Sequence, residues 1–308
     1  MLAIVSPGQG SQFTGMLSPW LEMERNRELV QSWGSVAKKD IYQLGVTGTS
    51  EEIKSTDNAQ LLILATSILS SLELEITPSM DEKIVFAGHS VGEISAYAVA
   101  NAYSFNDAIK LVSTRGTAMH EASKSNVATG MSAVLGGDKE QVIASLIRLD
   151  LVPANINSGK QIIAAGKSIQ LEKLLLNPPK NSRVKPLEVA AAFHTNFMLP
   201  ALNEFRKLAH SVSVNFVAQK LISNNDGELI RNPIDLIEKL INQIVMPVRW
   251  DLCQAKMVEL GVTGMLELAP GGTLCGIAKK EIPSVETFAI KSPEDLQGAN
   301  EFIRKHIG

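Results

Sequence analysis

Short apolar runs alternate with amphipathic stretches along most of the chain, and this alternation predicts parallel strands connected by helices. The runs Leu-Ala-Ile-Val at 2–5 and Ile-Val-Phe-Ala at 84–87 are uniformly apolar, which is typical of strands buried on both faces. Helical spacing of apolar residues predicts helices at 20–39, 58–75 and 106–123. The first part of the chain is therefore expected to form an α/β layer structure.

A segment of different texture begins near residue 131. Its predicted elements, in order, are a strand at 131–135, a helix at 139–149, strands at 153–157 and 161–165, a helix at 168–176 and a strand at 183–190. This βαββαβ order is that of a ferredoxin-like fold. We expect an inserted small subdomain over residues 127–190.

The remaining chain returns to alternating helices and strands. Helices are predicted at 199–210, 233–244 and 249–260, and strands at 220–223 and 263–268. Asp226 and Gly227 mark a turn. These elements are expected to complete the larger subdomain, to which residues 1–126 also belong.

The strand at 84–87 leads into Gly-His-Ser-Val-Gly at 88–92 and then into a helical stretch. A strand, a tight turn and a helix form the context of a G-x-S-x-G nucleophile elbow, in which Ser90 would occupy a strained turn with its hydroxyl exposed. The alternative is a Gly-flanked serine that caps a helix after an ordinary turn. The five-residue pattern alone leaves both open.

Composition narrows the classes of function. The chain has 308 residues, of which 45% are hydrophobic, and 29 basic against 32 acidic residues give a net charge of −3 without blocks of like charge. This balance argues against nucleic acid or a membrane surface as the main partner, and no apolar run predicts a transmembrane helix. Cys253 and Cys275 lack metal-like spacing, so we expect no metal and buried free thiols in a reduced, cytoplasmic setting.

A serine nucleophile at neutral pH needs a base, usually histidine. His194 follows Ala-Ala-Ala-Phe at 190–193, and these small residues permit another segment to approach closely. We favour His194 as the base, with a structural histidine as the alternative. Structural, surface or tail positions are expected for the other histidines, His89, His120, His210 and His306.

No aspartate or glutamate stands out as a triad acid, and a backbone carbonyl can accept the Nδ1–H bond instead. The oxyanion hole of an elbow uses the amide after the nucleophile, here Val91, and one from another loop. The loop Pro-Gly-Gln-Gly-Ser-Gln at 7–12 is the natural source of the second amide. Its alternative is a plain turn, since it lacks the Lys-Ser/Thr ending of a P-loop.

Arg115 lies in a predicted helix and is followed by Gly116, a residue that lowers helix stability. Glycine there indicates close packing, so Arg115 is expected to point inward. A buried arginine requires an anion, and a carboxylate is its best bidentate partner. The alternative is a solvated surface arginine.

These segments resemble the motifs of one family. The loop at 6–12 is similar to P-G-Q-G-S/A-Q, the elbow at 88–93 to G-H-S-x-G-E, and residues 115–119 to R-G-x-x-M. Further similar segments follow in the family's order: N-x-N-x-x-x-Q-x-V-x-x-G at 155–166, A-F-H at 192–194, P-V-R/Q-W at 247–250 and P-G-x-x-L at 270–274. The ordered set resembles malonyl-CoA:acyl-carrier-protein transacylases and the related acyltransferase domains of polyketide synthases.

The resemblance implies an α/β-hydrolase-like large subdomain with a parallel sheet, over residues 1–126 and 191–308, and the ferredoxin-like insert at 127–190. It implies that Ser90 is the nucleophile and that His194 is first general base and then general acid. The resemblance also assigns three supporting roles: an orienting backbone carbonyl at Arg249, oxyanion-hole amides at Gln9 and Val91, and a clamp on the malonyl carboxylate at Arg115.

Departures from the family pattern concern the edge of the site. Ala191 replaces the first histidine of the H-A-F-H form, His120 stands where glutamine is frequent, and Ser-Gly-Lys at 158–160 replaces an S-P-x turn. Phe193 is retained where methylmalonyl-selective domains usually have serine. Its ring leaves little room for an α-methyl group, so malonyl is the expected acyl group.

The implied substrates are malonyl-CoA and phosphopantetheinylated acyl carrier protein, with no bound cofactor. The length resembles a free-standing bacterial type II fatty-acid enzyme, and we expect a monomer. Three alternatives are kept: service to a polyketide synthase, an acyl hydrolase on the same fold, and a non-catalytic subunit that binds the carrier. Candidate basic residues for carrier docking, each with a solvated side chain as the alternative, are Arg183, Lys185, Lys279 and Lys280.

Overall fold

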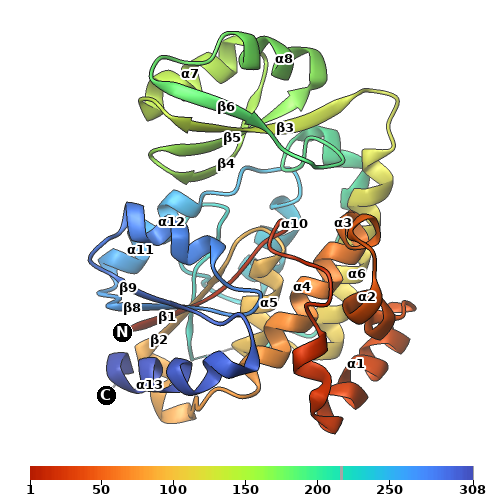
Figure 1. The fold of residues 1–308 in the computed structure, drawn as a ribbon, viewed down its shortest axis with the longest axis vertical. Helices are drawn as coiled ribbons and strands as arrows, with labels where there is room; N and C mark the ends of the chain where they lie inside the picture. Colours follow the sequence, from red (N-terminus) through yellow and green to blue (C-terminus); the bar gives the residue numbers. More distant parts are fainter. Residues whose placement is uncertain (216–217, 308) are drawn as a thin grey trace.

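The structure is a computed structural model that describes residues 1–215 and 218–307. Two subdomains, each built around its own sheet, lie one above the other (Figure 1). The predicted fold class is confirmed: a parallel sheet forms the larger subdomain and an antiparallel sheet the smaller one. None of the helices in the described ranges is long and apolar enough to cross a membrane.

The larger sheet has the strand order β7-β2-β1-β8-β9, and all its pairings are parallel. Its strands are β1 (Leu2–Ser6), β2 (Ile84–Gly88), β7 (Lys220–Leu221), β8 (Gly264–Glu267) and β9 (Glu286–Ala289). Every residue of β1 and β2 is buried, which explains their uninterrupted apolar sequence. Strand β2, next to the central strand β1, leads into the elbow.

Alternate residues of these strands enter two separate cores. Leu2 and Ile4 of β1 pack with the cluster formed by α4, α5, α6 and α13, whereas Ala3 and Val5 pack with α11 and α12. This alternation is the period-two geometry of a strand covered on both faces. The larger subdomain is therefore a three-layer α/β/α structure.

The helices of the larger subdomain supply these layers. They are α1 (Glu24–Ala37), α2 (Ile41–Thr47), α3 (Ser50–Lys54), α4 (Thr56–Ser71), α5 (Gly92–Val99), α6 (Phe105–Ser123), α9 (Leu202–Ala209), α10 (Pro233–Asn242), α11 (Trp250–Glu259), α12 (Thr273–Glu281) and α13 (Leu296–Ile307). Short 3-10 helices are η1 (Ser18–Glu22), η2 (Pro78–Lys83), η3 (Asn196–Ala201) and η4 (Pro293–Asp295). Helix α5 begins directly after the elbow.

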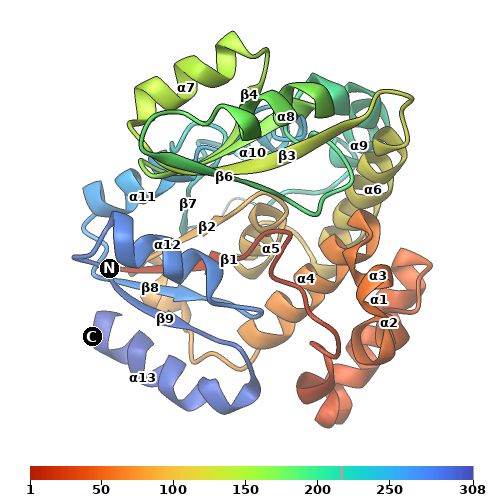
Figure 2. The ribbon, with the colours of Figure 1, turned by 45° about the horizontal axis from the view of Figure 1, so that its top comes forward.

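The smaller sheet has the order β4-β5-β3-β6 with antiparallel pairing. Its elements are β3 (Thr129–Gly136), α7 (Lys139–Arg148), β4 (Val152–Ser158), β5 (Gln161–Lys167), α8 (Ser168–Leu176) and β6 (Ser182–Pro186). This is the predicted βαββαβ arrangement. Helices α7 and α8 lie on the outer face (Figure 2), so the other face is turned toward the larger subdomain.

Backbone hydrogen bonds join the subdomains along one edge. The amide of Ile156 on β4 donates to the Val248 carbonyl, and the Val248 amide donates to the Ala154 carbonyl, both over 2.9 Å. Through these bonds the segment before α11 pairs with the edge strand β4 in parallel. The opposite edge carries the exposed ion pair of Lys54 with Glu188, at 2.7 Å.

Several predicted elements differ in extent from the observed ones. The strand predicted at 183–190 ends at Pro186, because the following residues leave the sheet to line the space between the subdomains. The strand predicted at 220–223 has two paired residues, since Ile222 instead bridges to Leu229. Helices α2, α3, α12 and α13 and strand β9 were not predicted at all.

Candidate active site

A cavity of about 330 Å³ lies between the two subdomains. The loop after β1 and the elbow form its floor, and β3, β4 and β5 of the small subdomain lie across it. Its lining residues include Gln9, His89, Ser90, Val91, Arg115, Met119, Met131, Asn155, Phe193, His194 and Leu274. The cavity thus gathers residues from segments far apart in the sequence.

Close backbone packing fixes the position of Ser90. A Cβ atom added at Gly92 would lie 2.2 Å from the Ser6 carbonyl oxygen, and one added at Gly88 would lie 2.0 Å from the backbone of Gly92. Ser90 itself has a φ of 55°, in the left-handed region that non-glycine residues rarely adopt. The strained strand–turn–helix geometry expected of an elbow is therefore present.

His194 contacts Ser90 directly. Its Nε2 atom lies 2.8 Å from the Ser90 Oγ atom, and its Nδ1 atom lies 2.8 Å from the backbone carbonyl of Gln243. Because a carbonyl only accepts, Nδ1 carries the hydrogen and Nε2 is left to accept the serine proton. His194 also has a left-handed backbone, with a φ of 59°. Both members of the pair are held in conformations that cost free energy.

The resemblance implied that the backbone carbonyl of Arg249 orients this histidine, but Nδ1 faces the carbonyl of Gln243. The carbonyl of Arg249 instead accepts hydrogen bonds from the amides of Leu252 and Cys253 in the first turn of α11. The Arg249 side chain pairs with Asp251 at 3.0 Å. Gln243, at the end of α10, supplies the carbonyl because its helix ends beside the imidazole ring.

The environment keeps His194 neutral. Burial, and after it the positive charge of Arg115, lower the pKa of His194 to about 3, although its bond to the Gln243 carbonyl acts in the opposite direction. A neutral imidazole is the form that can take a proton from serine. The ring is therefore neutral, with Nε2 free to accept a proton, over the whole physiological pH range.

Two backbone amides beside the elbow are candidate donors of an oxyanion hole. Gln9 and Val91 both line the cavity, and neither amide has a hydrogen-bond acceptor within residues 1–215 and 218–307. The loop that carries Gln9 is pressed against the elbow, since a Cβ atom at Gly8 would lie 2.6 Å from the His89 carbonyl oxygen. Free amides beside a nucleophile are the donors that stabilise a developing oxyanion.

Arg115 on α6 points inward, as predicted, with only 1% of its surface exposed. Its guanidinium donates to the side-chain carbonyl of Gln60 at 2.6 Å, to that of Gln243 at 2.7 Å and to Ser90 Oγ at 3.2 Å. It forms no ion pair with a carboxylate of the described ranges. Burial lowers the pKa of Arg115 to about 10, so the group is still charged at neutral pH.

Sequence reasoning missed the polar residues that support this arginine. Gln60, Glu93 and Gln243 are all buried. A signal was present, because each is a polar residue within an otherwise buried stretch: Gln243, for example, continues the apolar stripe of Leu236 and Leu240 on α10. A polar residue at a core position usually has a specific partner.

The other histidines lie away from the serine hydroxyl. His89 is half-buried, with Nε2 2.8 Å from the Asn157 Oδ1 atom and its ring edge-on to Trp250, so it ties the elbow to β4. His120 and His306 are partly buried, whereas His210 is exposed and lies 3.3 Å from Glu238. His306 belongs to α13 and not to a loose tail.

One retained residue and one departure from the family pattern lie at or behind the cavity. Phe193 lines the cavity beside His194 and is 5% exposed, whereas Ala191 is buried but is not part of the lining.

No group of three or more histidine, cysteine, aspartate or glutamate side chains within the described ranges could hold a metal ion.

Comparisons with known proteins agree with this geometry. The family described as "Acyl transferase domain" matches residues 4–288. The Malonyl CoA-acyl carrier protein transacylase of Mycobacterium bovis is 46% identical over 297 residues, which cover 96% of this chain and 98% of that relative. The crystal structure of MCAT from Mycobacterium tuberculosis matches with a TM-score of 0.93 and 45% identity over 97% of this chain and 99% of its own.

A further solved structure shows a malonyl-transacylase in complex with a type II polyketide-synthase acyl-carrier protein. It matches with a TM-score of 0.89 and 27% identity, and covers 97% of this chain and 99% of that chain. The relatives are thus similar to this chain over nearly their full length.

Proposed function

The chain belongs to the acyl transferase domain family, and from this membership and the site geometry we propose that it transfers a malonyl group from malonyl-CoA to acyl carrier protein. The acceptor in this proposal is the phosphopantetheine thiol of the carrier, and the malonyl group passes through an ester on Ser90. The observation that carries the proposal is a buried arginine that pairs with no carboxylate of residues 1–215 and 218–307 and whose guanidinium lies 3.2 Å from Ser90 Oγ, beside a neutral histidine.

In the first half-reaction, Ser90 Oγ attacks the thioester carbonyl while His194 Nε2 takes its proton. The Gln243 carbonyl stabilises the resulting imidazolium through Nδ1–H. The amides of Gln9 and Val91 donate to the oxyanion of the tetrahedral intermediate. The intermediate then expels coenzyme A, whose sulfur receives the proton from His194, and malonyl-Ser90 remains.

The second half-reaction reverses these steps with a new thiol. His194 takes the proton of the phosphopantetheine thiol, the thiolate attacks the ester carbonyl, and Ser90 leaves with the proton. Two half-reactions joined by a covalent enzyme predict ping-pong kinetics. This mechanism requires no resident cofactor.

Arg115 gives the selectivity for a dicarboxylic acyl group. Its guanidinium reaches Ser90 Oγ, so an acyl group esterified there places its distal carboxylate within reach of the same cation. A charge-assisted pair in a buried site is worth roughly 1.5–3 kcal/mol. Phe193 beside His194 narrows the same space, and we propose that it disfavours a methyl branch.

We propose fatty-acid elongation as the consumer of the product, a monomeric state and a cytoplasmic location. The free buried thiols Cys253 and Cys275 fit a reducing compartment. The basic residues Arg183, Lys185, Lys279 and Lys280 are all exposed and are candidates for docking an acidic carrier.

The function is tested by transfer from a panel of malonyl-, methylmalonyl-, acetyl- and butyryl-CoA to the phosphopantetheinylated carrier, followed by mass spectrometry of the carrier. We expect malonyl-carrier as the dominant product and little free malonate. Free malonate released with or without the carrier would instead establish a hydrolase. The absence of any acylated Ser90 would favour the non-catalytic carrier-binding subunit.

A further inference from the structure

Glu93, the residue that follows the elbow, has a fully buried carboxylate that accepts hydrogen bonds from three residues. Its Oε1 atom accepts the Tyr97 hydroxyl at 2.9 Å and the Asn224 amide at 2.8 Å, and its Oε2 atom accepts the side-chain amide of Gln243. Burial raises the pKa of Glu93, and the hydrogen bonds from the Asn224 amide and the Gln243 side chain oppose this by favouring the ionised form. The mechanism above assigns no role to Glu93.

These contacts determine which way the Gln243 amide points. Its NH₂ group donates to the Ser90 carbonyl at 3.0 Å and to Glu93 Oε2, so its oxygen is left to accept from Arg115 at 2.7 Å. Rotating the amide by 180° would place an NH₂ group against the guanidinium and an oxygen against the two acceptors. The carboxylate therefore selects the orientation that Arg115 requires.

A direct ion pair would not serve the same purpose. A carboxylate bound to Arg115 would occupy the donors that a substrate carboxylate needs, whereas a buried arginine without any nearby negative charge is strongly disfavoured. Glu93 does not contact Arg115 directly, because the side chain of Gln243 lies between them and is hydrogen-bonded to both. The negative charge of Glu93 nevertheless opposes the effect of burial on the pKa of Arg115. The cation is stabilised and still available to a ligand.

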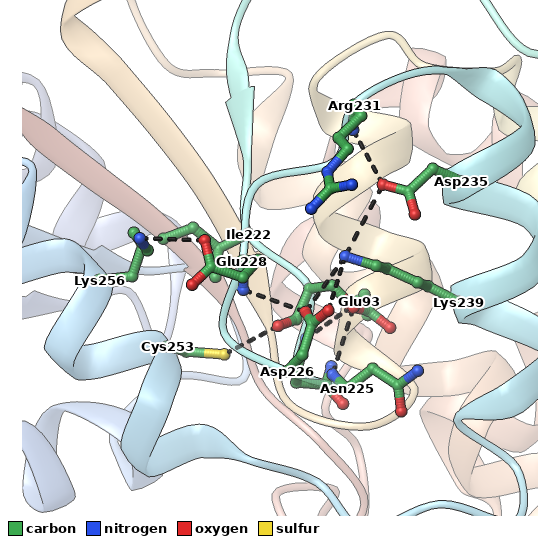
Figure 3. A network of polar contacts seen from close by, with 12 residues as sticks. Glu93, Ile222, Asn225, Asp226, Glu228, Arg231, Asp235, Lys239, Cys253 and Lys256 are labelled. Carbon is green, nitrogen blue, oxygen red and sulfur yellow. Dashed lines mark hydrogen bonds and ion pairs between the residues drawn. The ribbon is translucent and has the colours of Figure 1, made fainter.

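Two of the donors to Glu93, Asn224 and Gln243, belong to elements that are joined by polar contacts around the turn after β7, and Figure 3 shows these contacts. Lys239 on α10 donates to Asp226 of that turn at 3.1 Å, and the Arg231 amide donates to Asp235 at 2.9 Å. The turn carries Asn224, and α10 ends beside Gln243. The two donors are thus held relative to each other independently of Glu93.

We propose that Glu93 is a positioning residue for substrate selection, which fixes the Gln243 amide so that the Arg115 guanidinium stays aligned for a carboxylate-bearing acyl group. This inference rests on the proposed function, because it concerns the same acyl site. The chemical class that it favours is a short dicarboxylic acyl thioester over a monocarboxylic one.

The decisive variant is Glu93→Gln, which keeps the size of the side chain and removes its charge. In either orientation its own NH₂ group meets a donor, from Gln243 on one side or from Tyr97 and Asn224 on the other. We expect kcat/KM for malonyl transfer to fall at least about tenfold more than kcat/KM for acetyl transfer. A purely structural role would lower both values by the same factor.

Tyr97→Phe is the matched control, because it removes a hydrogen bond from the same carboxylate but leaves the contact with Gln243 and the charge in place. We expect its malonyl-to-acetyl ratio to stay within about twofold of the wild-type ratio. Thermal unfolding of both variants reports whether their stabilities are comparable. An unchanged ratio in Glu93→Gln, or an equal change in Tyr97→Phe, overturns the proposal.

If Glu93→Gln does not fold, Gln243→Leu tests the same link, since it removes the side-chain amide and retains the backbone carbonyl that faces His194. A selective loss of malonyl transfer is expected, and an unchanged ratio overturns the proposal. A wild-type chain that transfers no malonyl group would refute the proposed function itself. Wild-type transfer with an unchanged ratio in the variants refutes only the role of Glu93.

Discussion

Replacing Arg115 by alanine removes a buried positive charge from beside Ser90. The wild-type guanidinium is anchored by Gln60 and Gln243 and reaches Ser90 Oγ at 3.2 Å. A malonyl group on Ser90 would lose the charged contact proposed for its distal carboxylate, whereas an acetyl group has no such carboxylate. Comparing malonyl transfer with acetyl transfer therefore isolates the contact between Arg115 and the substrate carboxylate, because any other effect of the substitution lowers both rates.

The expected size follows from the strength of the lost contact. A hydrogen bond to a charged group contributes roughly 1.5–3 kcal/mol, and each 1.36 kcal/mol corresponds to a factor of ten in rate. Malonyl transfer should thus fall about 10- to 150-fold relative to acetyl transfer. A smaller, shared loss is also expected, because the contact with Ser90 Oγ disappears for both substrates.

The assay measures kcat/KM for transfer from malonyl-CoA and from acetyl-CoA to the same carrier protein, with circular dichroism to establish that the variant is folded. Arg115→Lys is the matched variant. It keeps the positive charge but loses the planar fork that contacts Gln60 and Gln243 together, so its loss of malonyl preference should be intermediate.

Equal losses for the two acyl groups in Arg115→Ala would refute the clamp. They would mean that the arginine acts on Ser90 or on the packing of α4 against α6, and not on the substrate carboxylate. A lysine variant as impaired as the alanine variant would place the whole effect in the geometry of the fork.

Two further predictions concern the base and the elbow. The pKa of His194 is lowered to about 3 in the folded chain, so the acid limb of kcat/KM should lie well below pH 6.5; a limb centred near 6.5 would show that the ring is not desolvated. Between about pH 6.5 and 3 only the unfolded chain binds this proton, so the free energy of unfolding should also fall as the pH falls through that interval. The fall should be smaller in His194→Gln, and denaturant unfolding at several pH values measures both. Gly92→Ala would place a methyl group 2.2 Å from the Ser6 carbonyl oxygen and should lower the unfolding temperature clearly, whereas Gly276→Ala, with no atom within 4 Å, should raise it slightly. Similar melting temperatures for the two variants would contradict the close approach at the elbow.

Much of the fold was predictable because its strands and helices carry strong local patterns. The buried runs of β1 and β2 and the βαββαβ order of the insert lie where the hydrophobic pattern indicated. The ends of elements were less predictable: the strand that begins at Ser182 stops at Pro186, because tertiary contacts and not propensity decide where the chain leaves the sheet. Helix α12 was missed although its first residues line the cavity.

The site divides in the same way. Ser90, His194 and Arg115 were predicted from residue type and from small residues beside them, glycines for Ser90 and Arg115 and alanines for His194, and the structure brings all three together. The carbonyl that faces His194 could not be found, since every residue has a carbonyl and its direction depends on where α10 ends. Side chains that support others, such as Gln243, are visible in sequence only as polar residues at core positions.

The most direct test of the proposed mechanism is the intact mass of the chain after incubation with malonyl-CoA in the absence of carrier protein. A single malonyl adduct is predicted for the wild-type chain, located on Ser90 by peptide mapping, and no adduct for Ser90→Ala. Addition of the carrier should then remove the adduct and give malonyl-carrier. An adduct of equal yield in Ser90→Ala, or transfer to the carrier without any adduct, would contradict the account.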